Sequence, residues 1–160
     1  MHENKAVDIT RDQLAANLNE DLAREYQAII AYIIYSQVIK GPQYMAIAKE
    51  LEVHAGEELA HALLICKQID YLGAKPTNVP KPVKTSDKAT DMLKFDLDNE
   101  TETIKNYRLR VREAEQLGEY GIAEAIRHIL TQEQEHLIDL ATALGIDVPK
   151  DSLGDKSSKS

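Results

Sequence analysis

The chain has 160 residues, of which 43% are hydrophobic and 29% are charged, a balance that allows one globular domain with an apolar core. Its formal net charge of −8 argues against a nucleic-acid partner and is compatible with the binding of cations. Because Cys66 is the only cysteine, the sequence excludes an intramolecular disulfide and any zinc or rubredoxin-type site built on a CxxC motif.

The start of the chain shows no targeting signal. Its first twenty residues carry charges throughout and contain no apolar stretch of the kind found in signal peptides. An uncharged run within residues 28–35 is far shorter than the roughly 20 apolar residues that a membrane-spanning helix needs. We therefore expect a soluble cytoplasmic protein without a membrane partner.

Hydrophobic periodicity predicts four long helices. The first begins after Thr10, which can form a capping box with Gln13, and it ends at the Lys40-Gly41-Pro42 break. The other three helices are expected at about residues 44–72, 88–117 and 120–144. No segment shows the alternation of apolar and polar residues that a strand requires.

The connection between the second and third helices is long and rich in proline. Residues 73–84 can span about 40 Å when extended, which is close to the length of a 30-residue helix. We therefore expect an all-α four-helix bundle in which two antiparallel hairpins are joined by a long crossover. The bundle would occupy residues 10–145, between an N-terminal extension (1–9) and a polar, disordered C-terminal tail (146–160).

Each helix carries an apolar stripe that a single glutamate interrupts near its middle. The four interrupting residues are Glu25, Glu58, Glu100 and Glu133. Most helical glutamates are solvated surface residues, so one such position would mean little. Four at matched depth are different, because burying an unpaired carboxylate costs several kcal/mol unless it is protonated, paired or bound to a metal. The pattern predicts a cation between the four helices.

The two halves of the chain repeat with an offset of 75 residues. The repeated pairs are Glu25 and Glu100, Tyr32 and Tyr107, Glu58 and Glu133, and His61 and His136. In each hairpin the two glutamates are equally far from the turn, so both lie at the same height. Each histidine follows its glutamate by three residues and shares its helix face. One Glu from each of two helices and an E-x-x-H pair from each of the other two form the di-iron or di-manganese carboxylate arrangement of helical bundles.

These motifs make the chain similar to the ferritin superfamily, and most of all to bacterioferritins, over about residues 10–145. The spacing of 33 residues within each glutamate pair and the run DMLKFDLDNE carry the resemblance. It implies that Glu25 and Glu100 are terminal ligands of one metal each and that Glu58 and Glu133 bridge both metals. By the same resemblance, His61 and His136 are the nitrogen ligands, and Tyr32 matches a tyrosine that lies beside the centre.

The resemblance also implies a function. A ferroxidase would bind two iron ions per subunit and oxidise Fe(II) to Fe(III) with dioxygen or hydrogen peroxide, for iron storage or detoxification, as a homo-oligomer. Manganese or zinc would also suit Glu and His ligands. Haem is not expected, because Leu59 stands where haem-binding bacterioferritins have methionine. The alternatives are a rubrerythrin-like bundle that reduces peroxide and a non-catalytic metal-binding helical interaction module.

The remaining polar candidates are interpreted as structural. Glu57 lies about 100° from the stripe of its helix and is expected beside the site or at the surface rather than as a ligand. We expect Tyr107 to pack in the core with its hydroxyl near the polar site, and Cys66 to pack in the core. The histidines outside the repeated motif are expected to be solvated, and these are His2, His54 and His128.

Overall fold

The computed structural model describes residues 8–153, and in that range it contains helices and no strand. The elements are α1 (Arg11–Val38), η1 (Pro42–Tyr44), α2 (Met45–Tyr71), α3 (Ala89–Gln116), α4 (Tyr120–Leu144) and η2 (Lys150–Leu153), where η marks a short 3₁₀ helix. The all-α prediction is confirmed, and the four long helices end within a residue or two of their expected limits. His2 and the N-terminal extension up to residue 7 lie outside the described residues.

Local signals in the sequence set the helix ends. The Thr10 hydroxyl accepts a hydrogen bond from the Gln13 amide, while the Gln13 side chain accepts one from the Thr10 amide, as the predicted capping box requires. At the end of α4, Gly145 adopts a left-handed conformation with φ of 67°, which an L side chain would resist.

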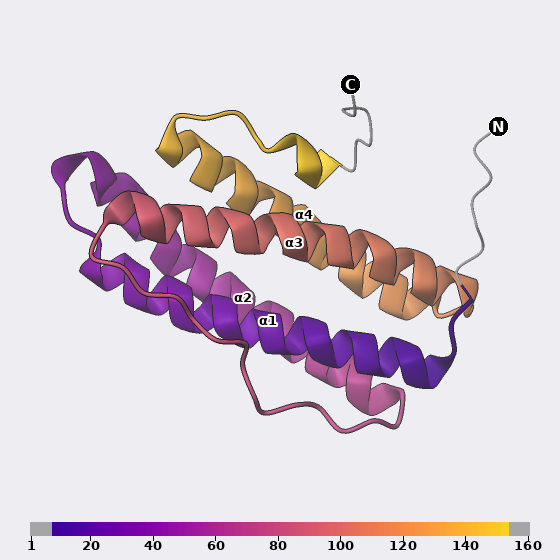
Figure 1. The fold of residues 1–160 in the computed structure, drawn as a ribbon. Coiled ribbons are helices and arrows are strands. Elements are labelled where there is room, and N and C mark those ends of the chain that lie inside the picture. The colour runs from indigo at the N-terminus through magenta and orange to yellow at the C-terminus, as the bar shows by residue number, and fades with distance from the viewer. Residues whose placement is uncertain (1–7, 154–160) are drawn as a thin grey trace.

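The bundle consists of two antiparallel hairpins, α1–α2 and α3–α4 (Figure 1). The crossover from α2 runs back along the bundle, so that α2 and α3 point the same way and the hairpins are related by an approximate two-fold axis. It lies against α1, where Lys81 donates its amide to the Ala23 carbonyl and Gln27 donates its side-chain amide to the Pro82 carbonyl, at 3.0 and 2.6 Å. The long-crossover prediction is confirmed.

The apolar core is divided into two clusters along the bundle axis. One includes Leu51, Leu93 and Leu140, and the other includes Leu18 and Ile126, all of which are fully buried. The mid-helix glutamates lie on the same stripes between these clusters. Apolar packing on both sides therefore holds the four helices around a polar layer.

The C-terminal segment differs from its prediction. We expected disorder from residue 146 onward, but residues 150–153 form η2 and pack on α3. Ser152 is buried there, and the Arg108 guanidinium donates a hydrogen bond to its carbonyl oxygen. This polar contact was not visible in the composition of the segment. Within the described residues, no helix is both long enough and apolar enough to cross a membrane.

Candidate metal centre

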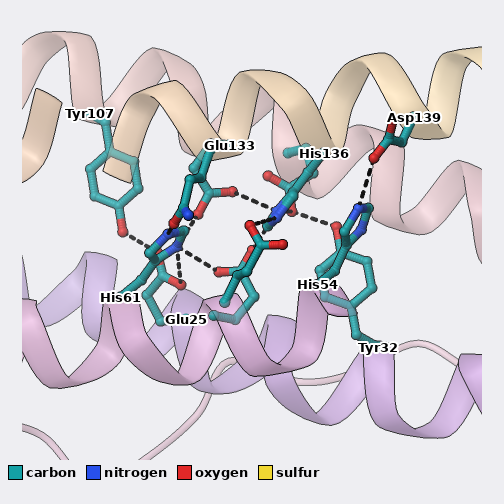
Figure 2. Close-up of polar contacts among 12 residues, drawn as sticks. Glu25, Tyr32, His54, His61, Tyr107, Glu133, His136 and Asp139 are labelled. Atoms are coloured by element: carbon teal, nitrogen blue, oxygen red, sulfur yellow. Dashed lines mark hydrogen bonds and ion pairs between the residues drawn. The ribbon is translucent and has the colours of Figure 1, made fainter. Parts of the chain in front are cut away.

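All four mid-helix glutamates lie in the interior of the bundle. Each of the four is at most 3% exposed, and one comes from each helix: Glu25 on α1, Glu58 on α2, Glu100 on α3 and Glu133 on α4. His61 and His136 are also buried, and their Nδ1 atoms face the carboxylates (Figure 2). The structure thus brings all six predicted ligands together at one height.

The ligand atoms form two groups that share two residues. The first group is Glu25, Glu58, His61 and Glu133, and the second is Glu58, Glu100, Glu133 and His136. Within each group the ligand atoms lie within 4.8 Å of one another. Glu58 and Glu133 belong to both groups, which is the geometry of two bridging carboxylates, whereas the other four residues each belong to one.

Each histidine bridges the two halves of the molecule. Nδ1 of His61 lies 2.8 Å from Glu133 Oε1, and Nδ1 of His136 lies 2.8 Å from Glu58 Oε1. Nε2 of His61 donates to Gln132 Oε1 at 2.5 Å, and Nε2 of His136 donates to Glu57 Oε2 at 3.2 Å. With Nε2 held as a donor, Nδ1 is the ring atom available to a metal. Glu57 belongs to neither ligand group, as expected.

Gln132 was missed by sequence reasoning, although the repeat could have found it. It follows Glu57 by the same 75 residues that separate the ligand pairs, and it makes the equivalent contact.

Two buried tyrosines cap the centre. The Tyr32 hydroxyl donates to Glu100 Oε1 at 2.6 Å, and the Tyr107 hydroxyl donates to Glu25 Oε1. Tyr107 packs in the core with its hydroxyl at the polar site, as expected, and the two-fold repeat gives it the same contact as Tyr32. Burial, and next the neighbouring carboxylates Glu100 and Glu25 respectively, raise the pKa of both phenols well above the ordinary value, so both hydroxyls remain donors.

The interpretation of His54 as solvated was wrong. It is 1% exposed, its ring stacks on that of His136 with centroids 4.0 Å apart, and its Nε2 lies 3.1 Å from Asp139 Oδ2. His54, Asp139 and the exposed Glu50 form a third group of side chains whose ligand-type atoms lie close together, on α2 and α4. His128 is exposed and Cys66 is partly buried, as predicted.

Glu58 and Glu100 retain protons in the absence of a cation, whereas, although burial opposes this, hydrogen bonds to Glu100, His136 and His61 lower the pKa of Glu133 to about 2. Burial, and next Glu133, raise the pKa of Glu58 well above its ordinary value and that of Glu100 to about 8. Although burial opposes it, contact with the surrounding glutamates raises the pKa of His61 and His136 far above 6.5. The metal-free centre is therefore a set of protons shared among carboxylates and imidazoles, and a bound cation would displace them.

The donor set fits two divalent cations. Glu25, Glu100 and Glu133 each have one buried side-chain oxygen without a hydrogen-bond partner. Buried acceptors rarely lack partners, because each costs about 1–3 kcal/mol. Four carboxylates also balance the charge of two divalent ions, and carboxylate with imidazole is a donor set that iron, manganese and zinc accept.

An ion network closes one end of the polar layer. Arg110 is buried and donates to Asp21 Oδ2 at 2.8 Å and to Glu113 Oε2 at 3.1 Å. The Asn17 side-chain amide donates to both Glu113 oxygens at 3.3 Å. This network pairs the charge of Asp21, one turn before Glu25. It also lay outside the sequence prediction.

A four-helix bundle with one long crossover and a central carboxylate–histidine cluster defines the class of di-metal carboxylate bundle proteins. A model of the ferritin-like domain matches residues 15–147, and the chain belongs to this family.

Relatives and solved structures agree with this assignment. A bacterial ferritin from Synechocystis sp. is 27% identical over 133 residues, with 82% of this chain and 85% of the relative covered. A bacterioferritin from Desulfovibrio desulfuricans is 26% identical over 121 residues, with 75% and 68% covered. A ferritin-like diiron-carboxylate protein from Bacillus anthracis superimposes with a TM-score of 0.81 at 30% identity, covering 86% of this chain and 99% of that one. A dodecameric thioferritin from Bacteroides fragilis gives 0.78 at 26% identity, with 86% and 87% covered.

Proposed function

We propose that this protein is a ferroxidase that binds two Fe(II) ions per chain and oxidises them to Fe(III). The observation that carries the proposal is the pair of four-residue ligand groups that share Glu58 and Glu133. Shared carboxylates hold two metals about 3.5–4 Å apart, close enough to act on one small oxidant. Each Fe(II) loses one electron, and dioxygen takes both electrons with two protons and leaves as hydrogen peroxide.

Within this proposal the residues divide the work. Glu25 and His61 bind one ion and Glu100 and His136 bind the other, while Glu58 and Glu133 bind both. Tyr32 and Tyr107 orient the terminal carboxylates by donating to them. The protons bound by the carboxylates and imidazoles of the metal-free centre are released when Fe(II) binds. Iron storage or detoxification in the cytoplasm is the proposed purpose.

The protein is also proposed to act as a homo-oligomer. Ile30, Ile33 and Ile34 form an exposed apolar strip on α1, and Leu59 and Leu63 are exposed on α2. The dodecameric assembly of the thioferritin from Bacteroides fragilis supports the same proposal. Sedimentation of a single monomeric species would contradict it.

Glu58→Ala provides the test of the ferroxidase. It removes a ligand from both groups, so we expect the initial rate of Fe(II) oxidation under air, measured by stopped-flow absorbance, to fall by about 100-fold or more. Glu57→Ala keeps every proposed ligand and removes only a hydrogen-bond partner of His136. We expect its oxidation rate to stay within about tenfold of the wild type, the lower end of the loss that such outer partners typically cause. Exposed Glu124→Ala is the control and should match the wild type.

Two further readouts complete this test. Anaerobic titration should show two tightly bound Fe(II) per chain before air is admitted, and circular dichroism should show that the Glu58→Ala helices are intact. Oxidation by hydrogen peroxide but not by dioxygen would indicate the rubrerythrin-like alternative. Equal rates in the wild type and in a well-folded Glu58→Ala variant would contradict the proposed site.

A further inference from the structure

The two halves of the centre are alike in shape but differ in charge. Glu57 and Gln132 occupy equivalent positions of the 75-residue repeat, each just before a shared glutamate. Glu57 accepts the Nε2–H of His136, whereas Gln132 accepts the Nε2–H of His61. One ligand histidine is thus held by a carboxylate and the other by a neutral amide.

This difference acts on metal affinity. An imidazole that donates to a carboxylate becomes a stronger electron donor through its other nitrogen, and such outer partners typically change metal affinity by about 10–100-fold. The Glu57 side chain is only 27% exposed, so solvent weakens its charge without removing its effect. The contact therefore favours a cation beside His136 over one beside His61.

A second break in the repeat falls in the same half of the centre. Asp21 and Asp96 are equivalent positions, each one turn before a terminal ligand. The charge of Asp21 is paired with Arg110, but the position equivalent to Arg110 is Tyr35, whose hydroxyl donates to the Lys84 carbonyl in the crossover. Among the residues that the structure describes, no cation contacts Asp96, and its Oδ2 is buried without a hydrogen-bond partner.

Both breaks fall in the half that holds Glu100 and His136. Burial raises the pKa of Asp96 well above its ordinary value, so the charge that distinguishes this half comes from Glu57. From this we infer that the two metal positions fill in a fixed order, the Glu100–His136 position first, and that the carboxylate of Glu57 is the positioning group that sets this order. The inference rests on the proposed function only in requiring that the two ligand groups bind divalent cations.

Binding of Co(II) to the full-length protein tests the order. Crystals loaded with one Co(II) per chain would show, by anomalous scattering, the relative occupancy of the two positions. A titration followed by cobalt visible absorbance would give the two affinities. In the wild type we expect the Glu100–His136 position to hold most of the cobalt, with affinities separated by about tenfold or more.

Matched variants separate charge from simple hydrogen bonding. Glu57→Gln keeps an acceptor for His136 but removes the charge, so the two affinities should converge by about tenfold. Gln132→Glu places the charge beside His61 and should raise the affinity of the other position. The double exchange should shift cobalt toward the Glu25–His61 position. Glu124→Gln, on the exposed side of α4, should leave occupancies as in the wild type.

The outcomes are distinct. Equal occupancy of the two positions in wild-type crystals loaded with one Co(II) per chain would overturn the fixed order. An order that persists unchanged in Glu57→Gln would overturn the role of Glu57, because a purely steric partner is preserved in that variant. If no cobalt binds at either ligand group in the wild type, the proposed function itself fails, and that result is separate from the other two.

Discussion

At the scale of single residues, the centre is built from groups that satisfy one another across the two halves of the molecule. Each terminal glutamate accepts a hydrogen bond from a tyrosine of the other hairpin, and each histidine faces a shared glutamate of the other hairpin. A side chain removed from one hairpin therefore leaves an unpaired group in the other. Buried polar networks of this kind lose more on a single deletion than a surface pair does.

Tyr32→Phe tests this coupling. It leaves Glu100 Oε1 without its donor in a buried site, and we expect the free energy of unfolding of the metal-free protein to fall by about 1–3 kcal/mol. Urea denaturation followed by circular dichroism would measure the loss. Tyr120→Phe is the control, because Tyr120 is 68% exposed, and it should change little. Equal stability of the two variants would show that the Tyr32 hydroxyl makes no net contribution.

The residues of the site that take part in the 75-residue repeat could be predicted from the sequence, and most of the others could not. The six proposed ligand residues follow from apolar stripes, E-x-x-H spacing and the 75-residue offset, whereas the resemblance to bacterioferritins placed Tyr32 beside the centre. His54 could not be predicted, because its burial depends on the stacking of its ring on His136, a contact between α2 and α4. Asp21 and Arg110 lie 89 positions apart in the sequence, and no local sequence pattern indicates that they form an ion pair.

At the scale of elements, the crossover lies along α1 and is fastened there by side chains. Asn19 donates its amide to the Lys75 carbonyl at 3.0 Å and accepts the Thr77 amide at 2.8 Å. The length and proline content of residues 73–84 predicted the crossover, because both suit an extended segment that spans the bundle. The partners on α1 could not be predicted, because they depend on the exact path of an irregular chain.

Asn19→Ala removes both of these hydrogen bonds. We expect a loss of about 1–3 kcal/mol in the free energy of unfolding, at a typical 0.5–1.5 kcal/mol per bond. Hydrogen exchange should also accelerate at the Thr77 amide, which loses its acceptor. Exposed Asn78→Ala, in the same segment, should change stability by less than about 0.5 kcal/mol. Protection of Thr77 that is the same in wild type and Asn19→Ala would contradict the contact.

At the scale of the whole molecule, two apolar clusters hold the fold and the central layer couples it to protons and metal. The pKa of Glu58 and Glu100 is raised in the folded metal-free chain, that of Glu100 from 4.5 to about 8. The folded state therefore binds more protons than the unfolded state between these values, and stability falls as pH rises across the window. The raised pKa of both histidines acts in the same direction above pH 6.5.

The melting temperature of the metal-free protein should accordingly decrease from pH 5 to pH 8. The lowered pKa of Glu133, about 2, contributes only at more acid pH. With two divalent ions bound, the cations replace the protons, so the melting temperature should vary much less and its excess over the metal-free value should grow with pH. Calorimetry of both forms across this range would measure the difference. A metal-free protein that becomes more stable as pH rises from 5 to 8 would contradict the proton-sharing description of the centre.

The most direct measurement is an anomalous difference map, collected at the iron absorption edge, from crystals loaded anaerobically with Fe(II). We expect two peaks about 3.5–4 Å apart, both within bonding distance of Glu58 and Glu133. One peak should lie beside Glu25 and His61 and the other beside Glu100 and His136. Iron bound only outside these residues, or a single ion held without the shared glutamates, would contradict the assignment of this layer as a di-iron ferroxidase centre.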